Sequence, residues 1–145
     1  MNNNKIKLSF SSRSENEAFA RSVIACFALS LNPSVAEISD IKTAVSEAVT
    51  NVIVHGYPNC EGEINMHAEI KDGGIHITIF DDGVGIENLS EALEPFYTSK
   101  PEEERSGMGF TIMKSFMDDV KVESEKGKGT KVYMFKKIRT DSIEK

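Results

Sequence analysis

Three polar residues recur at intervals of four in the stretch "SEAVTNVIVHGY" (46–57): Glu47, Asn51 and His55. On a helix, residues four apart lie on one face, with Cβ atoms about 5–6 Å apart. The Glu47 carboxylate could polarise a hydroxyl or a water, and the Asn51 carbonyl could supply one of the few protein oxygens that Mg²⁺ takes. The alternative for this pair is a solvated helix face with an i,i+4 hydrogen bond. His55 is interpreted as a helix-end residue stabilised by the C-terminal dipole.

A second candidate site is "DDGVGI" (81–86), directly after an apolar stretch that reads as a strand. Asp-Gly after a strand is commonly only a turn. Glycines at 83 and 85 additionally indicate a positive φ or a close approach to the backbone. A carboxylate at Asp81 could accept a hydrogen bond from an exocyclic amine such as that of adenine. Guanine presents an oxygen there, which would leave the carboxylate unpaired at a cost of about 1–3 kcal/mol.

A third candidate is "SGMGF" (106–110) at the expected start of a helix. Gly107 and Gly109 would let phosphate approach backbone N–H groups at the positive end of the helix dipole. Lys100 and Arg105 precede them and could stabilise phosphoryl charge. The alternatives are a flexible hinge for the glycines and a solvated charge run for the cations, since three glutamates separate them.

The elements that must position these residues follow from hydrophobic periodicity. A strand is predicted over 5–10, a hairpin turning at Gly73-Gly74 within 61–86, and a second hairpin around 127–129. The order of the elements predicts an α+β fold, a two-layer α/β sandwich. Its sheet is mixed but largely antiparallel, with helices on one face. We expect one domain over 1–145, with 138–145 as a frayed tail.

Three helices are expected between and after these strands. The first follows Ser14, which with Glu17 resembles a capping box. The second runs from about Ser34 to Gly56, and the third opens with Gly107 and Gly109. A short helix is considered near 89–93, and the polar segment 95–106 has the length of a lid or a disordered loop. The apolar faces expected for the first and third helices are Phe19, Val23, Phe27 and Leu31, and Phe110, Met113, Phe116 and Met117.

Composition limits the class of protein. The chain has 145 residues, of which 39% are hydrophobic and 28% charged, as expected for one soluble globular domain. A net charge of −6 argues against a nucleic-acid surface. No apolar run reaches the roughly 18 residues of a membrane span, and the N-terminus does not read as a signal peptide, so we expect a cytoplasmic protein. Cys26 and Cys60 have no metal-site spacing and are expected to be free thiols.

Taken together, these motifs resemble the GHKL ATPase/kinase superfamily, whose shared ATP site is the Bergerat fold. The resemblance rests on Glu-x-x-x-Asn, Asp-x-Gly-x-Gly, Gly-x-Gly and the pair Gly129-Thr130, and it covers about Ser9 to Phe135. Within that group, "SEAVTNVIVHGY" and "TSKPEEERSGMGFTIMKSFMDDV" look like the sporulation anti-sigma F factors, a family of serine-protein kinases. The chain has no room for the phosphoacceptor hairpin of a histidine kinase, or for the further domains of gyrase, Hsp90 or MutL.

The resemblance implies roles for the site residues. Glu47 would be the catalytic carboxylate, Asn51 the Mg²⁺ ligand and Asp81 the acceptor for the adenine amine. Thr130 would lie near the water network on the adenine side. The remaining implied roles are the base-side loop for Gly83 and Gly85, phosphate contact for Gly107 and Gly109, and lid contacts to the γ-phosphate for Lys100 and Arg105.

The resemblance also implies partners. The protein would sequester a sigma factor, sigma F, from RNA polymerase, and would phosphorylate an anti-anti-sigma STAS-domain protein on serine, acting as a homodimer with ATP and Mg²⁺. Arg21 is the candidate for the partner surface, with a solvated helix residue as the alternative. Two other functions stay open: an ATP-gated or ATP-independent sequestration module without phosphotransfer, and the ATP-binding part of a split sensor kinase.

Overall fold

The computed structural model describes residues 3–58, 60–85 and 109–139. Its five-stranded sheet has the order β1-β2-β3-β5-β4. All four strand pairs are antiparallel, in keeping with the largely antiparallel sheet that the sequence predicts, and no parallel pair is found among the described strands. The strands are β1 (Asn4–Ser11), β2 (Glu63–Lys71), β3 (Gly74–Asp81), β4 (Asp119–Ser124) and β5 (Thr130–Lys137).

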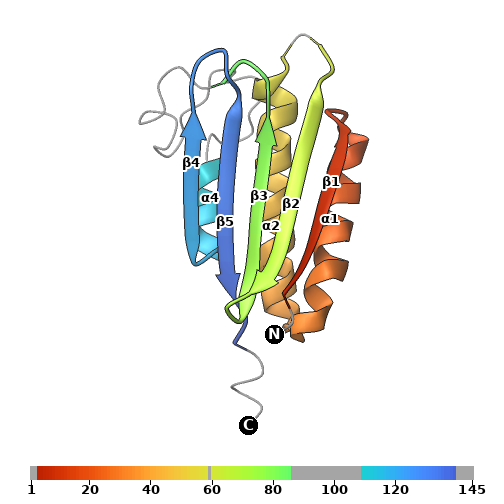
Figure 1. The fold of residues 1–145 in the computed structure, drawn as a ribbon, viewed down its shortest axis with the longest axis vertical. Helices are drawn as coiled ribbons and strands as arrows, with labels where there is room; N and C mark the ends of the chain where they lie inside the picture. The colour runs from red at the N-terminus through yellow and green to blue at the C-terminus, as the bar shows by residue number, and fades with distance from the viewer. Residues whose placement is uncertain (1–2, 59, 86–108, 140–145) are drawn as a thin grey trace.

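The helices all lie on one face of the sheet (Figure 1). α1 (Glu15–Ala28) is followed by a 3₁₀ turn, η1 (Leu29–Leu31). α2 (Val35–Asn51) continues into a π-helical turn, η2 (Val52–Gly56), and α4 spans Gly109–Phe116. The α+β two-layer architecture predicted from the sequence is therefore confirmed. The short helix expected near 89–93 and the segment 95–106 lie outside the described residues.

The core lies between the sheet and the helices. β2 and β3 follow the two-residue alternation expected of strands with one covered face. Their inward side chains meet the buried face of α2 and the inward residues of β5. The fully buried large side chains are Ile24, Ile41, Val45, Val49, Ile64, Met66, Ile75, Ile77, Ile79, Met113 and Met134.

The first hairpin turns at Asp72-Gly73, one residue before the predicted glycine pair. Both residues have positive φ, 59° and 72°, as a type I′ turn requires. Gly74 is instead the first residue of β3 and pairs with Lys71. A Cβ on Gly74 would lie 2.4 Å from the Lys136 carbonyl oxygen, so this glycine serves close strand packing.

The predicted apolar face of α1 is partly wrong. Phe19 is 67% exposed, and the fully buried positions are Ala20, Ile24 and Ala28. α1 packs on α2, and small side chains at a helix–helix contact let the two axes approach closely. Of the predicted face, Val23, Phe27 and Leu31 are partly buried against the core, while Phe19 lies outside. In α4, Phe116 is likewise at the surface, 36% exposed.

The capping box predicted at Ser14 is also wrong. Ser14 makes no side-chain cap hydrogen bond. The Glu17 carboxylate accepts hydrogen bonds from Arg21 at 2.9 Å and from Ser46 at 2.5 Å, and so links α1 to α2. The capping box forms at the start of α2, where Ser34 accepts from the Glu37 N–H and Glu37 accepts from the Ser34 N–H.

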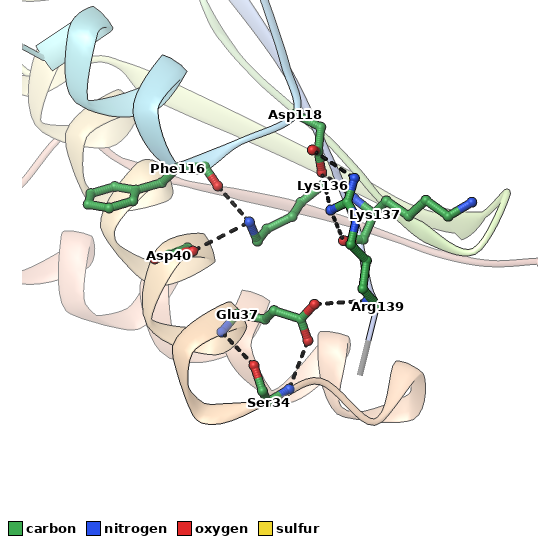
Figure 2. A network of polar contacts seen from close by, with 8 residues as sticks. All are labelled: Ser34, Glu37, Asp40, Phe116, Asp118, Lys136, Lys137 and Arg139. Carbon is green, nitrogen blue, oxygen red and sulfur yellow. Dashed lines mark hydrogen bonds and ion pairs between the residues drawn. The ribbon is translucent and has the colours of Figure 1, made fainter. Parts of the chain in front are cut away.

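A polar network closes the end of the molecule at which α2 begins and β5 ends (Figure 2). Lys136, only 8% exposed, points from β5 toward the helices. Its ammonium donates to the Phe116 carbonyl at 2.7 Å and lies 3.4 Å from the Asp40 carboxylate. A buried lysine is tolerated here because both partners satisfy it.

The same network holds the start of the predicted tail. The Ile138 side chain is buried, and its N–H donates to the Gly73 carbonyl. The Arg139 N–H donates to Glu37 at 2.8 Å, while its guanidinium pairs with Asp118 at 3.1 Å. The tail expected from residue 138 is thus held in place at 138 and 139, and 140–145 lie outside the described residues.

Candidate functional site

Asp81 ends β3 with a side chain that is buried, 4% exposed. Its Oδ1 accepts a hydrogen bond from the Gly83 N–H at 2.7 Å. Its Oδ2 is buried and has no hydrogen-bond partner among the described residues. Burial raises the pKa of Asp81, opposed by the N–H groups of Gly83 and Thr130 and reinforced by the charge of Asp82. A carboxylate placed in this way has one oxygen available to a donor on a ligand.

Glycines let the chain thread past this carboxylate. A Cβ on Gly83 would lie 2.1 Å from the Gly56 carbonyl oxygen, and one on Gly129 would lie 2.0 Å from the Asp81 carbonyl oxygen. Gly85 and Gly129 also have positive φ, 74° and 84°. The glycines predicted at 83 and 85 are therefore required by close backbone approach, as their spacing indicates.

The loop after β3 is fastened to the end of η2. The Asp82 N–H donates to the Tyr57 hydroxyl and the Val84 N–H to the Gly56 carbonyl, both at 2.9 Å. Gly127, in the β4–β5 turn, donates its N–H to the Val84 carbonyl at 2.6 Å. Our sequence reasoning missed Gly56 and Tyr57 as site residues. Both residues directly follow the polar row of α2, but no local pattern marks them, because their contacts are with the distant loop after β3.

The predicted acid and amide lie on the same helix. Glu47 and Asn51 are both half-buried, one turn apart at the end of α2. A Cβ on Gly109 would lie 3.1 Å from Asn51 Nδ2 and 3.2 Å from its Oδ1. The first residue of α4 therefore lies directly against the Asn51 amide. Lys100, Arg105 and Gly107 lie outside the described residues.

The π turn η2 joins these two groups of residues. It follows Asn51 without a break and ends at Gly56, where an added Cβ would lie 3.3 Å from Asp81 Oδ1. Single π turns within helices are frequent at functional sites. One continuous helix thus carries Glu47 and Asn51 beside α4 and reaches the Asp81 carboxylate with its last turn.

Two further predicted residues are paired within the protein. The Thr130 hydroxyl lies 2.7 Å from the Ser124 hydroxyl, across the β4–β5 pair. The Arg21 guanidinium, on α1, is bonded to Glu17. Arg21 is not among the contacts that bring together the Asp81 group or the Asn51 group.

Of the three histidines, His55 is at the helix end that the sequence predicts, and the other two lie away from the carboxylate and amide of the candidate site. His55 lies in η2, next to Gly56. His67 packs edge-on against Phe80, and burial together with two neighbouring lysines lowers its pKa. His76 Nδ1 lies 2.7 Å from the Tyr133 hydroxyl. Neither strand histidine lies with the carboxylate and amide of the candidate site.

Within residues 3–58, 60–85 and 109–139, neither a metal-binding cluster nor a membrane-spanning helix is present. There, no three His, Cys, Asp or Glu residues gather in a way that could hold a metal ion. No helix in those ranges is long and apolar enough to cross a bilayer. The candidate site therefore offers two sets of chemical groups. One is the buried acceptor of Asp81, and the other is the acid Glu47 and the amide Asn51 beside the start of α4.

Comparison with known proteins identifies related sequences. Residues 10–136 match the family model described as a histidine kinase-like ATPase domain. The anti-sigma F factor of Clostridium acetobutylicum is 58% identical over 135 residues, covering 93% of this chain and 94% of that protein. The anti-sigma F factor of Clostridium beijerinckii is 54% identical over 143 residues, covering 98% and 100%.

Solved structures support the same fold at lower identity. The RsbU and RsbW domains of Rv1364c from Mycobacterium tuberculosis superpose with a TM-score of 0.66 at 16% identity, over 93% of this chain and 32% of that one. The catalytic domain of the histidine kinase ThkA gives a TM-score of 0.59 at 15% identity, over 92% and 96%.

Proposed function

The chain belongs to the histidine kinase-like ATPase family and, within it, to the anti-sigma F factors, and we propose that it is an ATP-dependent serine-protein kinase that also sequesters a sigma factor. The observation that carries the ATP site is the buried, unpaired Oδ2 of Asp81. A buried acceptor without a partner costs about 1–3 kcal/mol, so its retention is explained if a ligand supplies the donor.

The donor we assign to Asp81 is the exocyclic amine of adenine. Oδ1 accepts from the Gly83 N–H, whereas Oδ2 is buried without a partner among the described residues, so we assign Oδ2 as the acceptor. Gly83 and Gly85 shape the loop beside the base, and an added side chain at either position would strike the backbone of a neighbouring segment. We place Thr130 near the water network on this side of the base.

We assign the phosphate end to Asn51 and the start of α4. The Asn51 amide lies against Gly109, at the helix terminus where backbone N–H groups favour anions. Asn51 would hold Mg²⁺ through its carbonyl oxygen, with phosphates and waters as the other ligands. Gly107 would add backbone contacts to the phosphates, and Lys100 and Arg105 contacts to the γ-phosphate. These three are carried over from the family motif.

Glu47 would act on the acceptor serine. ATP supplies the phosphoryl group: the serine oxygen forms a bond to the γ-phosphorus while the bond to the bridging oxygen breaks and ADP leaves. Glu47 accepts the serine proton. Because such transfer asks little covalent chemistry of the protein, positioning and charge stabilisation by these residues provide most of the catalysis.

The partners we propose follow from the family. The relatives are named anti-sigma F factors, so we assign sigma F as the sequestered partner. The phosphorylation substrate is an anti-anti-sigma STAS-domain protein, and the kinase acts in the cytoplasm as a homodimer. Arg21 is proposed for the partner surface. Its side chain is 37% exposed while paired with Glu17, so an acidic partner group could compete for the guanidinium.

The direct test incubates the protein with γ-labelled ATP, Mg²⁺ and the STAS-domain protein encoded beside it. We expect acid-stable label on a serine of that protein. Glu47→Ala should abolish the transfer and leave ATP binding nearly unchanged. Transfer by Glu47→Ala at the wild-type rate would show that the base is wrongly assigned.

Two other outcomes would replace this function. ATP binding without any label transfer would indicate a sequestration module. Acid-labile phosphate on a histidine of a separate chain would indicate the ATP-binding part of a split sensor kinase.

A further inference from the structure

Three consecutive N–H groups after β3 each have a different acceptor. The Asp82 N–H donates to the Tyr57 hydroxyl, the Gly83 N–H to the Asp81 carboxylate and the Val84 N–H to the Gly56 carbonyl. Two of these three acceptors belong to neighbouring residues at the end of η2. The conformation of the turn after Asp81 is therefore fixed mainly by hydrogen bonds to Gly56 and Tyr57 at the end of this helix.

The Tyr57 hydroxyl makes two hydrogen bonds at once. It accepts from the Asp82 N–H at 2.9 Å and donates to the Glu63 carbonyl at 2.8 Å. Asp82 directly follows β3 and Glu63 begins β2, so a single side-chain oxygen bridges the two strands at the candidate site. A phenolic hydroxyl can serve both because it has one proton to give and lone pairs to accept with.

Space for the Tyr57 ring is provided by a glycine. A Cβ placed on Gly62 would lie 2.2 Å from Tyr57 Cε1 and 2.3 Å from its Cζ. Because Gly62 has no side chain, the Tyr57 ring can lie against its backbone, and its hydroxyl reaches both Glu63 and Asp82. The position of the hydroxyl is thus fixed by packing as well as by hydrogen bonds.

We propose that Tyr57 is a positioning residue for nucleotide binding: its hydroxyl holds the Asp82 amide, and this keeps Oδ2 of Asp81 turned toward the base. The chain of contacts is short. The Asp82 amide fixes the peptide that follows Asp81, and that peptide aligns the Gly83 N–H with Oδ1, which leaves Oδ2 free. The inference rests on the proposed ATP site and adds Tyr57 to it.

Tyr57→Phe tests this with the loss of one oxygen. Because a typical net hydrogen bond is at stake, we expect the KM and Kd for ATP to rise about three- to tenfold, with kcat unchanged. A rise in KM alone would indicate poorer positioning of the base, whereas a fall in kcat would indicate damage to the groups that transfer the phosphoryl group. Gly62→Ala, which keeps the hydroxyl but displaces the ring, should raise KM in the same direction.

Tyr133→Phe is the matched control. Its hydroxyl is bonded to His76 at 2.7 Å, among outward side chains of the sheet, and takes no part in the proposed site. We expect Tyr133→Phe to leave ATP affinity unchanged. If Tyr57→Phe binds ATP as the wild type does, or if both variants weaken ATP equally, Tyr57 has no positioning role.

The variant Asp81→Asn distinguishes a failure of the proposed Tyr57 role from a failure of the proposed ATP site. Weak ATP binding by Asp81→Asn together with normal binding by Tyr57→Phe overturns the role of Tyr57 and leaves the ATP site standing. Normal binding by Asp81→Asn overturns the ATP site and the role of Tyr57 with it.

Discussion

Two aspartates at opposite ends of the sheet differ in their hydrogen-bond partners and in the direction of their pKa shifts. Asp118, before β4, accepts from the Lys137 N–H at 2.8 Å and pairs with the Arg139 guanidinium at 3.1 Å. Burial disfavours its ionised form, but these partners outweigh burial and lower its pKa. Asp81, at the end of β3, has one oxygen bonded and the other buried without a partner, and burial raises its pKa.

We interpret this difference as a division of roles, in which the Asp118 end stabilises the fold and the Asp81 end binds the proposed nucleotide. Asp118, Lys136 and Arg139 each have partners within the protein (Figure 2). Around Asp81, glycines bring the backbone close and leave an acceptor open. Burying an unpaired acceptor weakens the ligand-free fold, and the proposed nucleotide would supply the missing donor. Changes at the two ends should therefore be separable in experiments.

The largest effect is expected from Gly129→Ala, compared with Gly127→Ala. Both glycines have positive φ, 84° and 82°, but only at 129 would the Cβ meet backbone, 2.0 Å from the Asp81 carbonyl. Gly129→Ala should cost about 2–5 kcal/mol of unfolding free energy from strain and overlap, and should weaken ATP. Gly127→Ala should cost about 1–2 kcal/mol and leave ATP binding intact. Denaturant unfolding measures the loss of stability and ATP titration the loss of affinity. Equal losses in Gly129→Ala and Gly127→Ala would contradict the steric role of Gly129.

A smaller effect is expected from Lys136→Met at the other end. The change removes the bond to the Phe116 carbonyl and the pairing with Asp40, which is partly exposed. We expect a loss of about 1–3 kcal/mol of unfolding free energy. The Kd for ATP, measured well below the melting temperature, should not change. A large loss of ATP affinity in a folded Lys136→Met protein would break the separation of the two ends.

The smallest effect is expected from Asp118→Asn, and it should depend on pH. The folded state holds the pKa of Asp118 below its usual value, so the ion pair stabilises the fold above that usual value. The contribution disappears as pH falls through the lowered pKa. At pH 7 we expect a loss of about 0.5–1 kcal/mol, since the pair is partly exposed. Unfolding curves for wild type and Asp118→Asn should converge in acid; a constant gap would contradict this reading.

Much of the fold could be predicted from periodicity and turn residues. Alternation in 63–71 and 74–81 gave the central strands, because one face of each is covered. The face of α1 was mispredicted at Phe19, which hydrophobicity alone favours, whereas the fully buried positions are Ala20, Ile24 and Ala28. The capping box was misplaced for a similar reason. Ser-x-x-Glu occurs before both helices, and at Glu17 the tertiary partner Ser46 competes for the carboxylate.

The local geometry at the candidate site was predictable where close backbone approach requires glycine. Glycines at 83, 85 and 109 mark close approaches that the structure contains. Tyr57 could not be found in this way, because its function depends on strands that begin at Glu63 and end at Asp81 meeting beside it. A hydroxyl shared between distant segments leaves no local pattern in the sequence.

The most direct test of the account is an ATP titration of Asp81→Asn beside the wild type, with ligand-free unfolding measured on both. Loss of a charged acceptor predicts a Kd raised about 10- to 150-fold. Because a raised pKa means that stability is lost as pH rises through it, the ligand-free variant at pH 7 should be at least as stable as the wild type. Unchanged ATP affinity, or a variant that loses stability and affinity together, would contradict the claim that this aspartate is kept for the nucleotide.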